Sequence, residues 1–104
     1  MTKISPSKIE NLLCLNEKIK QSFVYGDKKN YLVALIVSES EENKKEIEFF
    51  LENLNKNLSL VEKVKKFRLI EEEFTIENGM LTPTLKLKRK TILEVYKKDL
   101  EKLY

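Results

Sequence analysis

The segment Tyr31–Val37, YLVALIV, limits the possible folds of this chain more than any other segment does. It contains no charged residue, yet it is far shorter than the ~20 apolar residues that a membrane-spanning helix needs. Side chains of a strand alternate between the two faces of a sheet, so an apolar run of this kind has to be covered on both faces. We therefore predict a central strand that is buried on both sides.

The preceding segment, Ile19–Gly26, has apolar side chains at nearly alternating positions and reads as a second strand. The polar residues Asp27–Asn30 separate it from the central strand. Two strand-like runs joined by a short polar turn beside a glycine are typical of an antiparallel hairpin. We predict this hairpin as the start of the sheet.

Helix signals stand at two places in the first half of the chain. Ser5 can cap the free N–H groups of a helix, and Pro6 then occupies the first helical position, where its missing donor costs nothing. Residues 38–58 form an amphipathic pattern, with Ser38 and Glu41 spaced as in a capping box. Both segments are predicted to be helices.

The remaining segments complete the predicted fold. Leu58, Val61 and Val64 suggest a short further helix, Lys66–Thr75 a third strand, and the apolar positions of Ile92–Leu103 a closing amphipathic helix. We therefore predict a single domain of the α+β class that covers all 104 residues. Its sheet is expected to be small and mostly antiparallel, built from the hairpin plus the third strand and packed with amphipathic helices.

Composition excludes several kinds of chemistry. The chain has no histidine and one cysteine, so Ser-His-Asp catalysis is ruled out, an internal disulfide cannot form, and a metal site is not expected. Cys14 lies in the apolar run NLLCL and is predicted to be a buried structural thiol. The net charge of +3 is too small to indicate nucleic-acid binding by itself.

The segment Glu77–Lys90, ENGMLTPTLKLKRK, raises the question whether one of its lysines takes part in chemistry. An Asn-Gly pair predicts a turn that reverses the chain ahead of the lysines. If the lysine row is a strand, Leu85 and Leu87 point inward while Lys86 and Lys88 point to solvent. Taken alone, such a row is an ordinary solvated strand face.

Three segments carry a family resemblance: ISPSKIENLL, FVYGDKKNYLVALIV and FTIENGMLTPTLKLKRK. In order and spacing they resemble the C-terminal domain of AMP-forming long-chain acyl-CoA synthetases, in the adenylate-forming superfamily, over nearly the whole chain. The wider superfamily has Thr-Gly-Lys followed by an arginine three residues after the lysine. Here Thr84, Leu85 and Lys86 take these places and Arg89 follows. Leucine in place of the glycine resembles the long-chain branch of the superfamily. The resemblance implies that Lys86 is the adenylation lysine.

The resemblance implies a fatty acid–CoA ligase that first forms an acyl-adenylate from ATP and then transfers the acyl group to CoA. A lysine between the attacking carboxylate and the α-phosphate would offset the repulsion between the two anions. ATP, CoA and Mg²⁺ are the expected cofactors of the intact enzyme, with none bound by this domain alone. The resemblance places the ATP and long-chain fatty acid sites in a large N-terminal adenylation domain that this chain lacks. The isolated domain is therefore expected to be inactive.

The small domain of such enzymes acts as a lid and rotates between the two half-reactions. Lys3, Ile4, Ser5 and Pro6 would be the remnant of a loop that lines the CoA channel. We expect Arg89 to pair with an acidic neighbour rather than to touch a phosphate. A cytoplasmic location is expected, and peripheral contact with the inner face of the membrane is left open.

Two other functions stay open at this point. A small basic module could bind nucleic acid or acidic partners without enzymatic activity, and its affinity would fall steeply with salt. A structural or docking domain would use its lysines only for solubility. On the resemblance, nucleic acid is not an expected partner.

Overall fold

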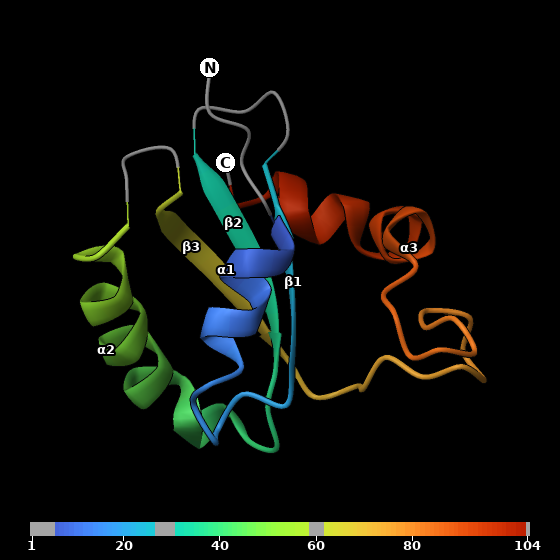
Figure 1. Ribbon diagram of the computed structural model, residues 1–104, viewed down its shortest axis with the longest axis horizontal. Helices are drawn as coiled ribbons and strands as arrows, with labels where there is room; N and C mark the ends of the chain where they lie inside the picture. Colours follow the sequence, from blue (N-terminus) through green and yellow to red (C-terminus); the bar gives the residue numbers. More distant parts are fainter. Residues whose placement is uncertain (1–5, 27–30, 59–61, 104) are drawn as a thin grey trace.

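The computed structural model describes residues 6–26, 31–58 and 62–103. The described elements follow the order α1, β1, β2, η1, α2, β3, α3, and the three strands form one sheet in the order β1-β2-β3. Figure 1 shows α1 and α2 on one side of this sheet and α3 on the other. The domain thus has three layers and is of the predicted α+β class.

The predicted hairpin is confirmed. β1 (Gln21–Tyr25) pairs antiparallel with β2 (Leu32–Val37), and every residue of β2 is buried. Alternate residues of β2 enter two separate cores, as expected for a strand covered on both faces. Leu32, Ala34 and Ile36 pack with α1 and α2, whereas Val33, Leu35 and Val37 pack under α3. The intervening turn, residues 27–30, lies outside the described residues.

The sheet is mixed rather than mostly antiparallel. β3 (Val64–Ile70) pairs parallel with β2 on the opposite edge from β1. Parallel neighbours need a crossover connection, and α2 (Lys44–Asn55) supplies it. Because the chain crosses one face of the sheet as a helix, β3 begins at the same end as β2.

The predicted short helix over Leu58, Val61 and Val64 is wrong at its last residue. Val64 was expected in that helix, but it is fully buried as the first residue of β3. The Asn55 side chain holds it there, since the amide accepts from Val64 N at 3.1 Å and donates to Val64 O at 2.9 Å. Residues 59–61 lie outside the described residues. At its other end β3 stops at Ile70, so the predicted strand over Lys66–Thr75 is shifted toward the N-terminus.

Helix starts also differ in part. α1 (Pro6–Leu13) begins at the predicted proline, while Ser5 lies outside the described residues. The predicted capping box at Ser38 is wrong, because Ser38 is fully buried and accepts from the Asn43 side chain at 2.9 Å. Ser40 instead caps the short 3₁₀ helix η1 (Glu41–Asn43) that precedes α2, and its hydroxyl accepts from Glu42 N. The closing helix is α3 (Arg89–Glu101).

The second core is closed by a segment that is neither helix nor strand. After β3 the chain leaves the sheet, and Phe74, Met80 and Leu81 bury their side chains beside Ile92 and Leu100 of α3. This segment runs past the edge of the sheet formed by β1 before it enters α3 (Figure 1). It contains the Asn-Gly pair and the lysine row.

Candidate functional site

Residues 80–88 form a short hairpin, called here the lysine hairpin. Leu81 and Leu87 pair across it in an antiparallel bridge. The Thr82 amide donates to the Lys86 carbonyl at 2.8 Å, and the Lys86 amide donates to the Thr82 hydroxyl at 3.1 Å. Lys86 is therefore held at the point where a three-residue loop rejoins the hairpin, and its side chain is exposed.

The loop of the lysine hairpin consists of Pro83, Thr84 and Leu85. The Leu85 amide donates to the Thr82 carbonyl at 2.8 Å, and Leu85 itself has a φ of 64°. A tight turn followed by a left-handed residue is a common three-residue hairpin loop, and proline suits the first loop position. The prediction that Leu85 packs inward is therefore wrong: its side chain is 68% exposed at the tip of the loop.

Leu85→Gly is expected to leave the chain equally stable or to stabilise it by up to about 1.5 kcal/mol. A left-handed backbone costs an L-residue roughly 1–2 kcal/mol, and the unfolded-state entropy of glycine offsets roughly 0.5–1 kcal/mol of the gain. Urea denaturation followed by circular dichroism measures the change. Leu85→Ala is the control, since it shortens the exposed side chain but keeps the strained Cβ. A glycine variant less stable than the alanine variant would contradict this explanation.

Asn78 organises the turn that leads into the lysine hairpin. Its side-chain oxygen accepts from the amides of Thr75 and Met80 at 3.0 and 3.1 Å, and its side-chain nitrogen donates to the Glu73 carbonyl at 2.9 Å. Gly79 has a φ of 79°, which glycine adopts without steric cost. The predicted Asn-Gly turn is confirmed. Besides favouring a turn, the Asn78 side chain forms hydrogen bonds that hold the turn in place.

A side-chain amide attaches this turn to the sheet. Gln21 of β1 donates to the Phe74 carbonyl at 2.9 Å and accepts from the Phe74 amide at 2.7 Å. These two bonds copy the pattern of a neighbouring strand at the edge of β1. The path into the lysine hairpin is thus fixed to the sheet without extending it.

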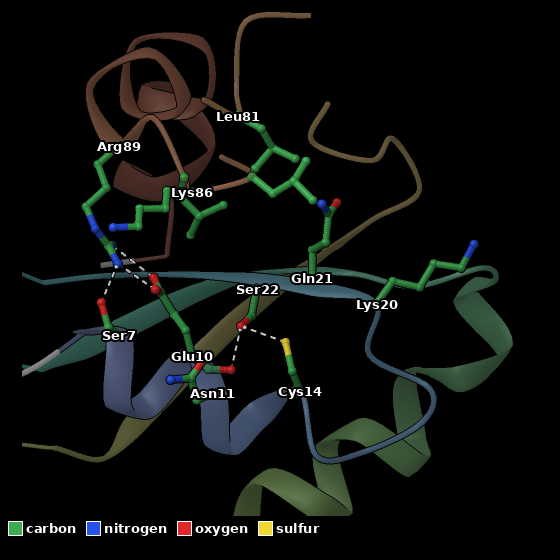
Figure 2. Close-up of a pocket in the computed structure, with 12 residues that line it drawn as sticks. Ser7, Glu10, Asn11, Cys14, Lys20, Gln21, Ser22, Leu81, Lys86 and Arg89 are labelled. Carbon is green, nitrogen blue, oxygen red and sulfur yellow. Dashed lines mark hydrogen bonds and ion pairs between the residues drawn. The ribbon is translucent and has the colours of Figure 1, made fainter. Parts of the chain in front are cut away.

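The lysine hairpin, β1 and one side of α1 line an open cleft of about 610 Å³ (Figure 2). Figure 2 shows Lys86 and Arg89 entering from the hairpin side and Glu10 and Cys14 facing them from α1 and the residue after it. Residues from both ends of the chain therefore meet in this cleft. Its polar lining consists of Ser7, Glu10, Asn11, Cys14, Lys20, Gln21, Ser22, Lys86 and Arg89.

Cys14 is exposed, so the prediction of a buried thiol is wrong. α1 ends at Leu13, and the apolar run NLLCL turns away from the core immediately afterwards. The Cys14 sulfur lies 3.5 Å from the Ser22 hydroxyl, at the edge of the cleft. The helical period places Ile9 and Leu13 in the core, and Cys14, which follows Leu13, lies outside it.

The prediction that Arg89 pairs with an acidic neighbour is confirmed, and the structure identifies that neighbour as Glu10 of α1. Both guanidinium nitrogens Nη1 and Nη2 donate to the Glu10 carboxylate, the first at 2.9 Å. Glu10 is buried, with 6% of its surface exposed. Arg89 is thereby engaged in a structural contact, whereas Lys86 forms no ion pair with any residue in the described part of the chain.

Lys20, at the far end of the cleft, is neutralised by carboxylates. Its ammonium donates to Glu73 at 3.0 Å and lies 3.5 Å from Glu39. The hydrogen bond to Glu73 raises the pKa of Lys20 above its ordinary value. Lys20 stays positively charged at neutral pH and has local counter-ions, whereas Lys86 has no ion-pair partner among the residues that the structure describes.

The other predicted site residues are placed only in part. Lys3, Ile4 and Ser5 lie outside the described residues, and Pro6 is the half-buried first residue of α1. Within residues 6–26, 31–58 and 62–103, no three histidine, cysteine, aspartate or glutamate side chains come together in a way that could hold a metal ion. None of the helices described here has the length and apolar character needed to cross a membrane.

Comparison with known proteins identifies relatives of this domain. The family model described as the AMP-binding enzyme C-terminal domain matches residues 1–104. Long-chain-fatty-acid–CoA ligase 6 of Rattus norvegicus is 33% identical over 97% of this chain, and ligase FadD15 of Mycobacterium tuberculosis is 30% identical over 97%. The chain spans about a fifth of these relatives, 18% and 21% of their lengths.

Solved structures agree with this relationship. The A-PCP didomain of carboxylic acid reductase from Segniliparus rugosus, in complex with AMP, superposes with a TM-score of 0.83 at 28% identity, over 96% of this chain and 16% of that one. The adenylation domain of a carboxylate reductase from Mycobacterium chelonae gives a TM-score of 0.82 at 30% identity, over 94% and 17%. The alternative of a basic binding module receives no support from these comparisons. The chain belongs to the family of AMP-binding enzyme C-terminal domains, and it is homologous to the C-terminal part of long-chain fatty acid–CoA ligases.

Proposed function

We propose that this chain is the C-terminal domain of an AMP-forming long-chain fatty acid–CoA ligase and that Lys86 is its adenylation lysine. The observation that carries the proposal is the exposed ammonium of Lys86, which has no ion-pair partner among the described residues and lies on a hairpin fixed to the sheet. The chain is homologous to such ligases over 97% of its length. The substrates would be a long-chain fatty acid, ATP and CoA. The partner would be a large N-terminal adenylation domain.

Exposure decides how Lys86 could work. Two unit charges about 4 Å apart interact by about 1 kcal/mol in water and by about 4 kcal/mol at an effective dielectric constant of 20. In this chain Lys86 faces solvent, so its charge becomes effective only when another protein surface covers it. The adenylation domain would supply that surface. Lys86 would then stabilise the negative charge that develops as the carboxylate attacks the α-phosphate.

The second half-reaction would follow after the domain rotates. Lys86 would leave the adenylate, and residues 3–6 would approach the channel for the CoA thiol. Mg²⁺ would neutralise phosphate charge in the intact enzyme, and the described residues of this domain contain no cluster suited to hold it. We further propose a cytoplasmic location, which stays a prediction.

Fatty-acid-dependent exchange of labelled pyrophosphate into ATP tests the proposal. We expect the intact enzyme that contains this chain to catalyse exchange with palmitate or oleate. The 104-residue chain alone should show none, because the proposed ATP and acyl sites lie elsewhere. Exchange by the isolated chain would overturn the proposal that the ATP and acyl sites lie in another domain. No exchange by the intact enzyme with any long-chain fatty acid would overturn the proposed substrate class.

A further inference from the structure

Glu10 is a buried carboxylate with no part in the proposed chemistry. Besides the two contacts with Arg89, its Oε2 accepts from the backbone amide of Val24 in β1 at 2.7 Å. One carboxylate therefore joins α1, the edge of the sheet and the first residue of α3. Burying an ionised carboxylate is costly unless its oxygens are well paired, and here both oxygens have donors.

Arg89 is held on several sides. The guanidinium carbon lies 5.5 Å from the ring centre of Phe23, and Nη2 lies 3.5 Å from the Ser7 hydroxyl. A guanidinium presents its donors in a planar fork that matches a carboxylate, whereas a lysine ammonium is a single point charge. The Glu10–Arg89 contact therefore defines an orientation as well as a charge balance.

The position of Arg89 in the chain links this contact to Lys86. Arg89 follows Lys86 by three residues, and the intervening Lys88 donates its amide to the Met80 carbonyl at 2.8 Å. Three residues span about 10 Å at most, so fixing Arg89 against α1 restricts where the end of the lysine hairpin can lie. Gln21 fixes the approach to the hairpin, through Phe74, and Arg89 fixes its exit.

We propose that the Glu10–Arg89 pair is a positioning device that sets the placement of Lys86 for acyl-adenylate formation. This inference rests on the proposed function. Neither residue touches substrate: Glu10 orients Arg89, and Arg89 holds the exit of the lysine hairpin. Shifting a catalytic group by about 1 Å can cost about 100-fold in rate, so small losses of geometry here are expected to have measurable effects.

Arg89→Lys in the intact enzyme is the first test, because it keeps the charge and removes the fork. We expect acyl-adenylate formation to slow by about 10-fold to 100-fold, with the KM for ATP changed less than twofold. Thioester formation from supplied acyl-adenylate should change less than threefold. The matched control is Arg68→Lys, since Arg68 also pairs with an acid, Asp99, at 3.7 Å but lies on β3. The control should stay within twofold of the parent enzyme in both half-reactions.

A double-mutant cycle separates positioning from a direct role. If Arg89 acts through Lys86, then Arg89→Lys should change adenylate formation less than twofold in a Lys86→Ala background. A full 10-fold further loss in that background would show that Arg89 acts independently and would overturn the inference. A parent-like rate for Arg89→Lys alone would also overturn it.

Hydrogen exchange in the 104-residue chain gives a readout that does not depend on activity. In Arg89→Lys we expect faster exchange of the Thr82 and Leu85 amides, which close the lysine hairpin, and unchanged exchange of the Leu35 amide in β2. Equal acceleration at all three sites would indicate global destabilisation and contradict a positioning role. If the parent enzyme forms no adenylate, the proposed function fails, while the exchange experiment still decides whether the pair holds the hairpin.

Discussion

Lys86→Ala in the intact enzyme is expected to slow acyl-adenylate formation by about two to three orders of magnitude. Removing one preorganised donor from a developing charge typically has an effect of this size. Thioester formation from supplied acyl-adenylate should be affected far less, because Lys86 is proposed to leave the site before that step. Single-turnover measurements of each half-reaction provide the comparison.

The control for this variant is Lys90→Ala. Lys90 is also exposed and stands four residues later, on the first turn of α3. We expect its replacement to change both half-reactions less than twofold. If Lys86→Ala lowers the two half-reactions equally, misfolding rather than lost chemistry is the explanation, and the assignment of Lys86 fails.

Phe74→Ala is expected to destabilise the domain by about 3–5 kcal/mol, the usual cost of removing a large buried aromatic side chain. Phe74 is 1% exposed and packs edge-on against Tyr96, with ring centres 6.4 Å apart. The hydrogen bonds between the Phe74 main chain and the Gln21 side chain are kept in this variant. The loss of stability therefore measures the effect of the cavity that the missing ring leaves. This is a large part of the roughly 5–15 kcal/mol that stabilises an ordinary domain.

Urea denaturation of the 104-residue chain measures this effect, and the sequence offers a matched control. Phe49 is also a phenylalanine, but it is 68% exposed on α2. Phe49→Ala should change the free energy of unfolding by less than about 0.5 kcal/mol, as for ordinary surface substitutions. Similar losses for the two variants would contradict the placement of Phe74 in the core under α3.

Local patterns were sufficient for most elements. The apolar run of β2 predicted its central, doubly covered position, and alternation with a polar turn predicted the pairing with β1. Pro6 marked the start of α1. These signals succeed because the period of a strand or the cap of a helix depends on neighbours in the chain.

The direction of β3 could not be read in the same way. A strand of either direction shows the same side-chain alternation, and only the crossover through α2 makes β3 parallel to β2. Val64 illustrates the difficulty, since an apolar residue three positions after Val61 suits a helix and is equally suited to begin a buried strand. The Asn55 side chain, nine residues earlier, decides the outcome.

In the candidate site, too, features with a local motif were predicted and features that depend on distant contacts were not. Lys86 was proposed from its motif and stays a prediction, whereas Glu10 and Gln21 were missed because their partners lie 79 and 53 residues away. A charged residue beside the buried position Ile9 was the available hint for Glu10. Leu85 was misplaced because alternation assumes a strand, whereas the Thr82–Leu85 hydrogen bond closes a loop.

By itself, then, the sequence determined the α+β class and the buried β2, and its family motif led to the proposal for Lys86. These depend on residues close together in the chain. Only the tertiary structure decided the parallel pairing of β3 with β2 and the choice of Glu10 as the ion-pair partner of Arg89. Contacts between distant segments form only when the whole core closes, so no local pattern encodes them.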